Sequence, residues 1–239
     1  MRVLCFTALF GEDGSQPIDI PKPFEKICES WDYIMLTNYP AEVFPADLSW
    51  TLKHVPHPTE DYPRGKHIYA NRWFKWHPWL IGYYDVYIYI DARQAPSIQY
   101  KIDWLELCKI ANSGNRLIHC THDVHQCIYT ELKEILKARK DTVENMDKVC
   151  AHISSHGMPE NEGMFWNGCY VLSRGAIPII KPIWSDLWKD MLKLTYRDQS
   201  LYMFHVWKNT PALMDVLCVT RLDNIVVETD DPYNHFYTG

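Results

Sequence analysis

Runs of apolar residues and their spacing divide the chain into alternating strands and helices. The clearest run is 86–90, Val-Tyr-Ile-Tyr-Ile, which carries no charge and alternates β-branched with aromatic side chains. This composition is typical of a strand buried in a sheet. Asp91 follows directly, and an ionised carboxylate is costly to bury without a partner. We therefore expect Asp91 either to have a partner inside the protein or to contact a ligand.

The same reading predicts the other elements along the chain. Periodicity of two predicts strands, whereas apolar positions three and four apart predict helices. Residues 40–65 are rich in proline and have few periodic apolar positions, so we expect an irregular connection there. The expected strands are 2–10, 33–36, 117–119, 165–173, 216–220 and 224–227, and the expected helices are 24–29, 67–79, 97–111, 125–138, 143–154, 182–194 and 197–207.

Strands and helices alternate through the first half of the chain, which favours an α/β fold with a mixed, mostly parallel central sheet flanked by helices. We expect a single domain over 1–239, with a nucleotide-binding half of about 1–115 and an acceptor-side half of about 116–239. Ligands of such sheets bind at the carboxyl ends of the strands. The loops after Phe10, Leu36 and Ile90 are therefore expected to share one edge.

Composition narrows the class of protein further. Hydrophobic residues make up 47% and charged residues 23% of the 239 residues, which is typical of a globular chain. The net charge of −6 gives no reason to expect a nucleic-acid partner. No apolar run is long enough to span a membrane, and the first residues lack the features of a signal peptide. We therefore expect reduced cysteines and a cytoplasmic location.

The end of the 86–90 strand resembles a metal-binding pattern with one change. A hydrophobic strand that ends in Asp-x-Asp is typical of nucleotide-sugar glycosyltransferases, in which the acids hold a divalent cation on the diphosphate. Here the second acid is replaced by Arg93. Arg93 could itself contact a diphosphate, or it could simply pair with Asp91. If a metal is used, its hard oxygen ligands suit Mn²⁺ or Mg²⁺, with Asp91 and a distant group such as His235 as ligands.

Three other stretches contain candidate site residues. Arg197, Asp198 and Gln199 open an apolar helix; Asp198 is either a helix-start acid, worth about 0.3–1 kcal/mol, or a sugar-contacting group. Two Cys and three His in 119–127 match no regular zinc spacing, so we prefer His122 as a site residue at a strand end. The Asn-Gly within FWNGCYVLS indicates a bulge, a close backbone approach or a plain core strand.

The order of these motifs carries a resemblance to a known family. A helix with Asn-Arg-x-x-Lys (71–75) is followed by YIDAR, by H-x-x-H-x-x-I-Y-x-E (122–131), by the FWNGCYVLSR strand and by YRDQS (196–200). This order, over roughly 65–210, resembles a glycosyltransferase-like family once described as a domain of unknown function, whose plant members are linked to mucilage and pectin synthesis and to turgor control. That family has W-I-D-G-N, H-x-x-R-x-x-x-Y-E-E and R-D-Q. This chain has His125 and Thr130 in place of the second motif's Arg and first Glu.

The resemblance implies a GT-A-like fold and transfer of a sugar from a UDP- or GDP-linked donor to a sugar hydroxyl of a glycan acceptor. It implies catalytic roles for Asp198, Arg197, Gln199 and Asp91. Asp198 would act as the base if configuration inverts, or would position the sugar if configuration is retained. The implied donor-binding residues are Thr7, Ala8, Leu9, Thr37, Asn38, Arg72, Lys75, Asp91, Ala92 and Arg93, and the implied acceptor- or sugar-binding residues are His122, Trp166, Asn167 and Gly168.

Two alternatives stay open. One plant member of the family has been described as a ceramidase, so a lipid amidase is the enzymatic alternative, although the chain has no G-x-S-x-G nucleophile elbow. A sugar- or nucleotide-sugar-binding module without activity is the alternative from another class. Aromatic residues, 14% of the chain, suit stacking on sugar rings under either sugar-handling hypothesis.

Overall fold

A central sheet organises the described part of the chain. The computed structural model describes residues 1–11, 20–55, 67–122, 126–220 and 226–228. Within them, seven strands form a sheet in the order β3-β2-β1-β4-β7-β6-β8. The bounds are β1 Val3–Leu9, β2 Asp32–Thr37, β3 Thr51–His54, β4 Val86–Ile90, β6 Leu117–Thr121, β7 Phe165–Ser173 and β8 Leu217–Thr220. Only β7 runs antiparallel to its neighbours in this sheet, so the predicted mixed, mostly parallel α/β architecture is confirmed.

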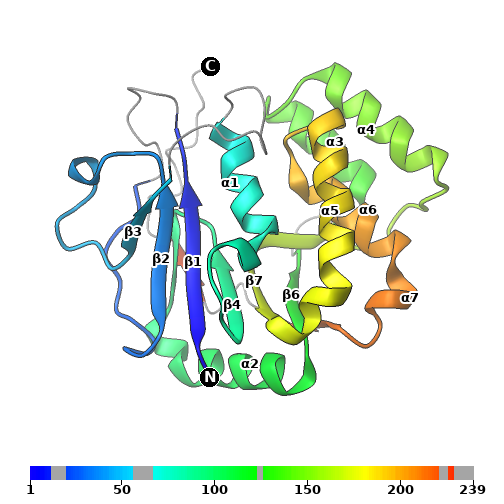
Figure 1. The fold of residues 1–239 in the computed structure, drawn as a ribbon. Coiled ribbons are helices and arrows are strands. Elements are labelled where there is room, and N and C mark those ends of the chain that lie inside the picture. Colours follow the sequence, from blue (N-terminus) through cyan, green and yellow to red (C-terminus); the bar gives the residue numbers. More distant parts are fainter. Residues whose placement is uncertain (12–19, 56–66, 123–125, 221–225, 229–239) are drawn as a thin grey trace.

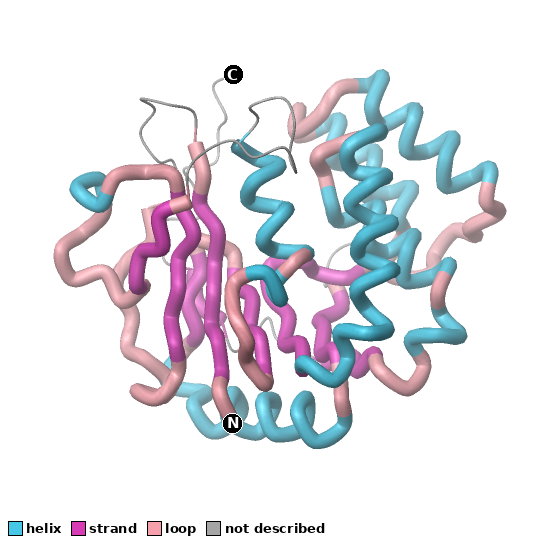
Figure 2. Tube along the Cα trace, in the orientation of Figure 1, coloured by secondary structure: helices cyan, strands magenta, loops and turns pink. Residues whose placement is uncertain are grey.

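Helices cover the sheet, and most of them gather beside β7, β6 and β8 (Figures 1 and 2). Two short strands pair with each other outside the main sheet. They are β5 Gln94–Pro96, which follows the end of β4, and β9 Val226–Glu228. The described α-helices are α1 His67–Trp76, α2 Lys101–Gly114, α3 Ile128–Lys137, α4 Val143–Ser155, α5 Ile177–Leu194, α6 Asp198–Lys208 and α7 Thr210–Leu213.

The two faces of the sheet bury two different groups of side chains. Along β4, Val86, Ile88 and Ile90 belong to the hydrophobic core that contains Trp104 of α2. Tyr87 and Tyr89 belong to the other core, which is shared with α1, α5 and α6. The alternation seen in the sequence is therefore an alternation between two buried faces, since successive side chains of a strand point to opposite sides.

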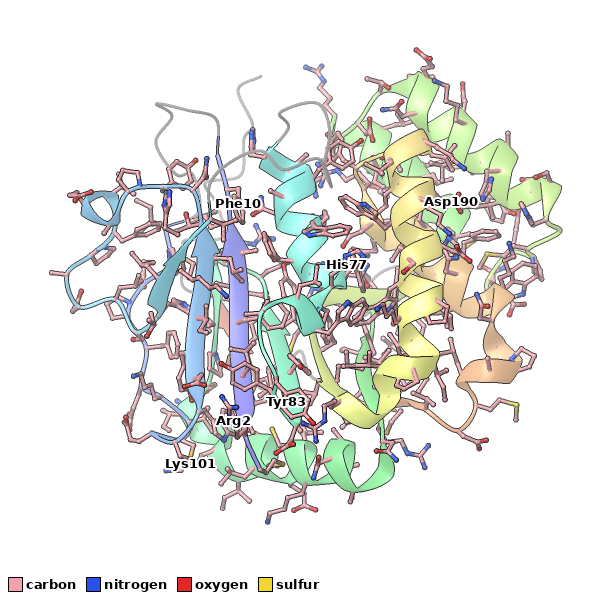
Figure 3. The ribbon with its side chains drawn as sticks, in the orientation of Figure 1. Arg2, Phe10, His77, Tyr83, Lys101 and Asp190 are labelled. Atoms are coloured by element: carbon pink, nitrogen blue, oxygen red, sulfur yellow. The ribbon has the colours of Figure 1, made fainter. Side chains whose placement is uncertain are left out.

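Helices on the tyrosine-bearing face are linked to one another by polar contacts as well as by packing. Asp190 of α5, labelled in Figure 3, accepts a hydrogen bond from His205 Nε2 of α6 (3.0 Å). The same Oδ2 atom lies 3.3 Å from His152 Nε2 of α4. These contacts link α4 and α5 to the last turn of α6.

The expected helix at 24–29 and the expected connection at 40–65 differ most from the structure. The predicted helix at 24–29 is wrong: this segment is not helical, and Phe24 instead donates its N–H to Ser49 Oγ and packs against Tyr33 and Trp50. The irregular connection predicted for 40–65 contains β3, which pairs in parallel with β2. Both differences arise because tertiary contacts outweigh the local sequence pattern. Residues 56–66 of this connection lie outside the described part.

Two further expectations concern cysteines and membrane spans. All eight cysteines are free thiols in the structure, and five of them are buried. Free buried cysteine behaves as a small hydrophobic residue. Four of the five buried ones, Cys5, Cys108, Cys120 and Cys169, belong to the core that contains Trp104. None of the helices in the described ranges combines the length and the apolar character that crossing a bilayer requires.

Candidate functional site

The candidate site lies where the parallel strands β1, β2 and β4 end. Their carboxyl ends meet at one edge of the sheet, as the sequence predicted, because β1 pairs in parallel with both neighbours. Phe10 marks this edge in Figure 3, whereas Arg2 marks the opposite end of β1. Asp91 follows Tyr87 and Tyr89 at a spacing of two, so its side chain starts on the face that α1 covers.

Helix α1 places three polar side chains against this edge. Asn71 Oδ1 accepts the backbone N–H of Phe10 (2.9 Å), which joins the helix to the end of β1. Arg72 and Lys75 lie three residues apart and therefore on the same side of the helix. Lys75 is 1% exposed, although lysine is almost never fully buried unless it is paired. Its burial indicates that the ammonium has partners inside the protein.

Asp91 has two such partners. The hydroxyl of Tyr89 donates to Asp91 Oδ1 at 2.6 Å. Lys75 Nζ lies 4.0 Å from the same oxygen, and the Asp91 side chain keeps 32% exposure. The Asp91 backbone N–H also bonds to the Gly168 carbonyl of the neighbouring β7 (2.9 Å). The strand-end carboxylate is therefore held by groups of the protein itself and still reaches solvent.

Asp198, at the first position of α6, is the most enclosed carboxylate of the site. Its Oδ2 lies 2.8 Å from Lys75 Nζ and its Oδ1 lies 3.3 Å from Arg72 Nε, and its side chain is 6% exposed. Burial alone would raise the pKa of this carboxyl, but the adjacent Arg72 and Lys75 outweigh burial and lower the pKa to about 2. Asp198 is therefore ionised at neutral pH and is a poor proton acceptor.

Lys75 is the common partner of both acids. Burial lowers the pKa of the Lys75 ammonium, and the two carboxylates, Asp198 first, oppose that shift. The ammonium also lies 5.0 Å from the centre of the Tyr89 ring and 5.1 Å from that of Trp76. At about 4 Å two unit charges interact by about 4 kcal/mol at the effective dielectric typical near a protein surface. This attraction and the ring contacts offset part of the cost of removing the ammonium from water.

Two adjoining cavities meet at this group of charges. The first has a volume of about 280 Å³ and lies at the ends of β1 and β4. Among the described residues, four cationic side chains line it against one carboxylate, that of Asp91. Its lining residues include Ala8, Leu9, Asn71, Arg72, Asp91, Ala92, Arg93, Lys140 and Arg197. A local excess of positive charge favours an anionic ligand, even though the chain as a whole carries a net charge of −6.

The second cavity, of about 400 Å³, shares five lining residues with the first: Arg72, Asp91, Arg93, Lys140 and Arg197. It extends from these residues towards β7, α3 and the start of α6, and its walls are mostly polar. Its remaining lining residues include Lys75, His122, Glu131, Glu134, Trp166, Asn167, Gly168, Asp198 and Gln199. The structure thus brings together the residues predicted after β4, on β7 and at the start of α6.

Two features of β7 shape the wall of this second cavity. The pairing of β6 with β7 shifts register opposite 167–169, so of the three alternatives that the sequence left open for the Asn-Gly pair, an irregularity of the bulge type is the one observed. A Cβ on Gly168 would lie 2.3 Å from the Trp166 ring, so glycine lets that ring lie against the strand. Asn167 is 3% exposed, and its amide N and O have no hydrogen-bond partner among the described residues. A buried amide without a partner is free to bind a polar ligand.

Some residues predicted for donor binding lie elsewhere. Thr7 is fully buried and belongs to the face of β1 opposite to α1, and Thr37 Oγ1 accepts the backbone N–H of Tyr39 (3.0 Å). The Asn38 side chain bonds to the backbone of Gly11. None of these three lines either cavity, so contact with a donor stays a prediction for them. His125 and His235 lie outside the described residues.

The expected divalent cation can be compared with the donor atoms that these residues offer. Mn²⁺ and Mg²⁺ need several oxygen ligands, often carboxylates. Asp91 Oδ1 already accepts from Tyr89 and faces Lys75, and both oxygens of Asp198 face cations. Within the part of the chain that is described, no three His, Cys, Asp or Glu side chains are grouped so that they could hold a metal. The described residues do not fit a divalent cation.

Several residues of the site were not predicted from the sequence. Asn71 was part of the quoted Asn-Arg-x-x-Lys pattern, which could have identified it. Tyr89 looked like a core residue of a strand, although its spacing of two from Asp91 was a usable signal. Lys140 comes from the connection between α3 and α4, where no motif marks it. The Lys140 carbonyl accepts hydrogen bonds from Arg197 Nε (3.1 Å) and Nη2 (3.0 Å), which orients that guanidinium beside the first cavity.

Comparisons with known proteins give little further information. No protein-family model matches the chain, and no curated protein matches it. Among solved structures, the chain is similar to mouse xyloside xylosyltransferase 1 in its apo form, with 10% sequence identity and a TM-score of 0.45. That alignment covers 92% of this chain and 85% of the mouse chain. A similarity this distant carries no functional argument by itself.

Proposed function

We propose that this protein is a GT-A-like glycosyltransferase that moves a sugar from a nucleoside-diphosphate sugar to a sugar hydroxyl of a glycan acceptor. The observation that carries the proposal is the pair of cavities that share Asp91 and four cationic residues, Arg72 and Arg93 among them. In the first cavity these cations face one carboxylate of the described residues, which suits a diphosphate. The second cavity adds further carboxylates, Trp166 and Asn167 to the same cations, which suits sugars. The common boundary of the two cavities is where the bond between phosphate and sugar would lie.

In this proposal, the first cavity holds the donor's diphosphate. Arginine donates paired hydrogen bonds that match phosphate oxygens, and Arg72, Arg93 and Arg197 all line this cavity. Ala8 and Leu9 at the end of β1 form its apolar side. The small side chain of Ala8 leaves room next to the backbone, which suits the nucleoside part of a UDP- or GDP-linked sugar. Positive charge here would also stabilise the leaving diphosphate.

The second cavity would hold the transferred sugar and the acceptor. Trp166 offers an aromatic surface for a sugar ring, and the Asn167 amide can both donate to and accept from sugar hydroxyls. His122 and Gln199 add further hydrogen-bonding groups to the same walls. Every hydroxyl bonded in this way would help to fix the position of the reacting carbon relative to the diphosphate.

Asp198 would act by accepting hydrogen bonds rather than by taking a proton. Its pKa of about 2 is far below the range in which a general base works well at neutral pH. An ionised carboxylate held by Arg72 and Lys75 can nevertheless bind one or two sugar hydroxyls strongly. This property supports the sugar-positioning role that the sequence left open for Asp198, in preference to the role of catalytic base.

Calorimetric titration of the full chain with UDP and GDP, each with and without Mn²⁺, tests the proposal. We expect one of the two nucleotides to bind with a Kd of micromolar order. UMP or GMP is the control, and it should bind at least about tenfold more weakly because it lacks the second phosphate. If neither diphosphate binds under either condition, the transferase proposal is wrong. Binding of free glycans alone would then favour the sugar-binding module.

A further inference from the structure

The charges around Asp91 raise the question of how a diphosphate would be neutralised at this site. Within the described part of the chain, Arg72, Arg93, Lys140 and Arg197 line the first cavity together with one carboxylate, that of Asp91. These four cations come from α1, from the turn after β4, from the α3–α4 connection and from the residue before α6. Parts of the chain that are far apart in sequence therefore supply positive charge to one space, which is typical of a built anion site.

Three of the four carboxylate oxygens that could hold a metal here already face donors or cations of the protein: Asp91 Oδ1 and both oxygens of Asp198. Asp91 Oδ1 is bonded to the Tyr89 hydroxyl at 2.6 Å and faces Lys75 Nζ at 4.0 Å. Asp198 is enclosed between Arg72 and the same Lys75 ammonium. A divalent cation bound by these acids would lie within a few ångströms of a fully buried like charge, and such a charge cannot move away into solvent.

Residue 93 points to the same conclusion. An Asp-x-Asp pattern would place a second carboxylate at this position, and the chain has a guanidinium that lines both cavities. A guanidinium forms paired hydrogen bonds with phosphate oxygens, whereas a carboxylate can approach them only through a bridging cation. Replacement of the acid by arginine thus supplies directly the charge that the metal would have supplied.

We infer that Arg72 and Arg93, supported by the buried Lys75, take the place of a divalent cation, so that this site binds a diphosphate without metal. The inference rests on the proposed function and makes it more specific. Lys75 is a positioning residue in this scheme. It pairs with Asp91 and Asp198 and so keeps these two carboxylates away from the ligand phosphates. Lys75 does not itself line the first cavity.

The first test measures the binding of UDP and of inorganic pyrophosphate to the full chain by calorimetry, in EDTA and then in excess Mn²⁺. We expect Kd values that agree within about threefold between the two conditions, because the fixed cations carry the interaction. Binding that requires Mn²⁺, or that tightens by tenfold or more with it, would overturn the inference and leave the proposed function standing. Absence of binding in both conditions would overturn the two together.

The second test assigns the effect to Arg93. Arg93→Gln should weaken UDP binding in EDTA at least tenfold, and Arg93→Lys should weaken it less because the charge is kept. Arg174→Gln is the matched control; Arg174 pairs with Asp85 at the opposite end of β4, and its replacement should change the Kd by less than twofold. Circular dichroism checks that each variant is folded. Unchanged affinity in folded Arg93→Gln would contradict the inference.

Discussion

At the scale of single residues, the site is explained by the cost of burying charge. Asp198 and Lys75 are both almost completely enclosed, and each would be unfavourable alone in this position. Together with Arg72 and Asp91 they form a group of two acids and two bases in which every charge has an opposite neighbour. The carboxylate that ends β4 therefore has its partner inside the protein, and its exposed part remains available to a ligand.

Asp198→Asn should reveal how much this group contributes to stability. Removal of one member of a buried ion pair leaves its partner uncompensated, which typically costs about 3–5 kcal/mol. This is well above the value of about 0.3–1 kcal/mol expected for an acid that only starts a helix. We expect the free energy of unfolding, measured by urea denaturation at neutral pH, to fall by about 3–5 kcal/mol in this variant.

Asp186→Asn is the matched control for this measurement. Asp186 lies on α5, is 62% exposed and pairs with Lys189 at 2.7 Å. An exposed pair of this kind contributes about 0–1 kcal/mol, so the control should unfold nearly like the parent. If Asp198→Asn also changes the free energy of unfolding by less than about 1 kcal/mol, Asp198 does not balance the buried cations as the distances indicate.

The sequence identified several of these residues but not their arrangement. Asp91 and Asp198 were visible because each follows or begins an apolar run, and Arg72 and Lys75 were visible because of their helical spacing. Their mutual pairing was not visible, because it depends on how α1 and α6 approach the same strand end. Tyr89 was hidden for a related reason: the pattern of a buried strand does not show which side chain donates a hydrogen bond.

At the scale of elements, agreement with the sequence follows the strength of the local pattern. The bounds of β4 and β7 match the predicted ranges, because long buried strands are almost purely apolar. Strand β3 was missed, because Thr51–His54 is short and largely exposed at the sheet edge. Helix α5 begins at Ile177, five residues before the predicted start, and contains Pro182 within it. The sequence pattern predicts this proline at the first position of the helix, where it is better tolerated.

Strand β6 provides a prediction for the behaviour of the fold in acid. His119 is fully buried, its Nδ1 accepts the N–H of Cys120 (3.0 Å), and its ring stacks on Tyr202 at 4.9 Å. Burial, with a smaller contribution from the Lys75 ammonium, lowers the pKa of His119 to about 3. In the unfolded chain, the His119 side chain therefore binds a proton below the ordinary histidine pKa of about 6.5. In the folded protein it does not bind this proton until about pH 3.

The sign of the effect follows from this difference. Stability from a neutral His119 is fully present above about pH 6.5 and is lost as pH falls towards 3, at about 1.4 kcal/mol per pH unit. The free energy of unfolding can be measured by urea denaturation at several pH values between about pH 7 and pH 4.5. Its slope against pH should be flatter by this amount in His119→Asn than in the parent. His156→Asn is the control, since His156 is exposed at the end of α4. Equal slopes in His119→Asn and the parent would contradict the assignment.

At the scale of the whole molecule, charge is distributed unevenly. The chain has a net charge of −6, yet the described residues that line the cavity at the ends of β1 and β4 include four cations and one acid. Composition alone could not have shown this, because the four cations are spread from residue 72 to residue 197. A local anion site is therefore compatible with an acidic chain. The same uneven distribution predicts how a ligand will respond to salt.

If the first cavity binds a diphosphate through fixed cations, ionic strength should weaken the complex. Raising KCl from about 0.1 M to about 1 M shortens the screening length from about 10 Å to about 3 Å. We expect the affinity for UDP, measured by calorimetry in EDTA, to fall by roughly tenfold or more over this range.

Lys140→Gln should bind UDP more weakly at low salt and should show a flatter salt dependence, because one of the four cations is removed. Lys109→Gln is the control, since Lys109 is 70% exposed on α2, pairs there with Glu106 and lines neither cavity. It should follow the parent curve. An affinity for UDP that does not change with salt would mean that the cations of the first cavity do not carry the binding.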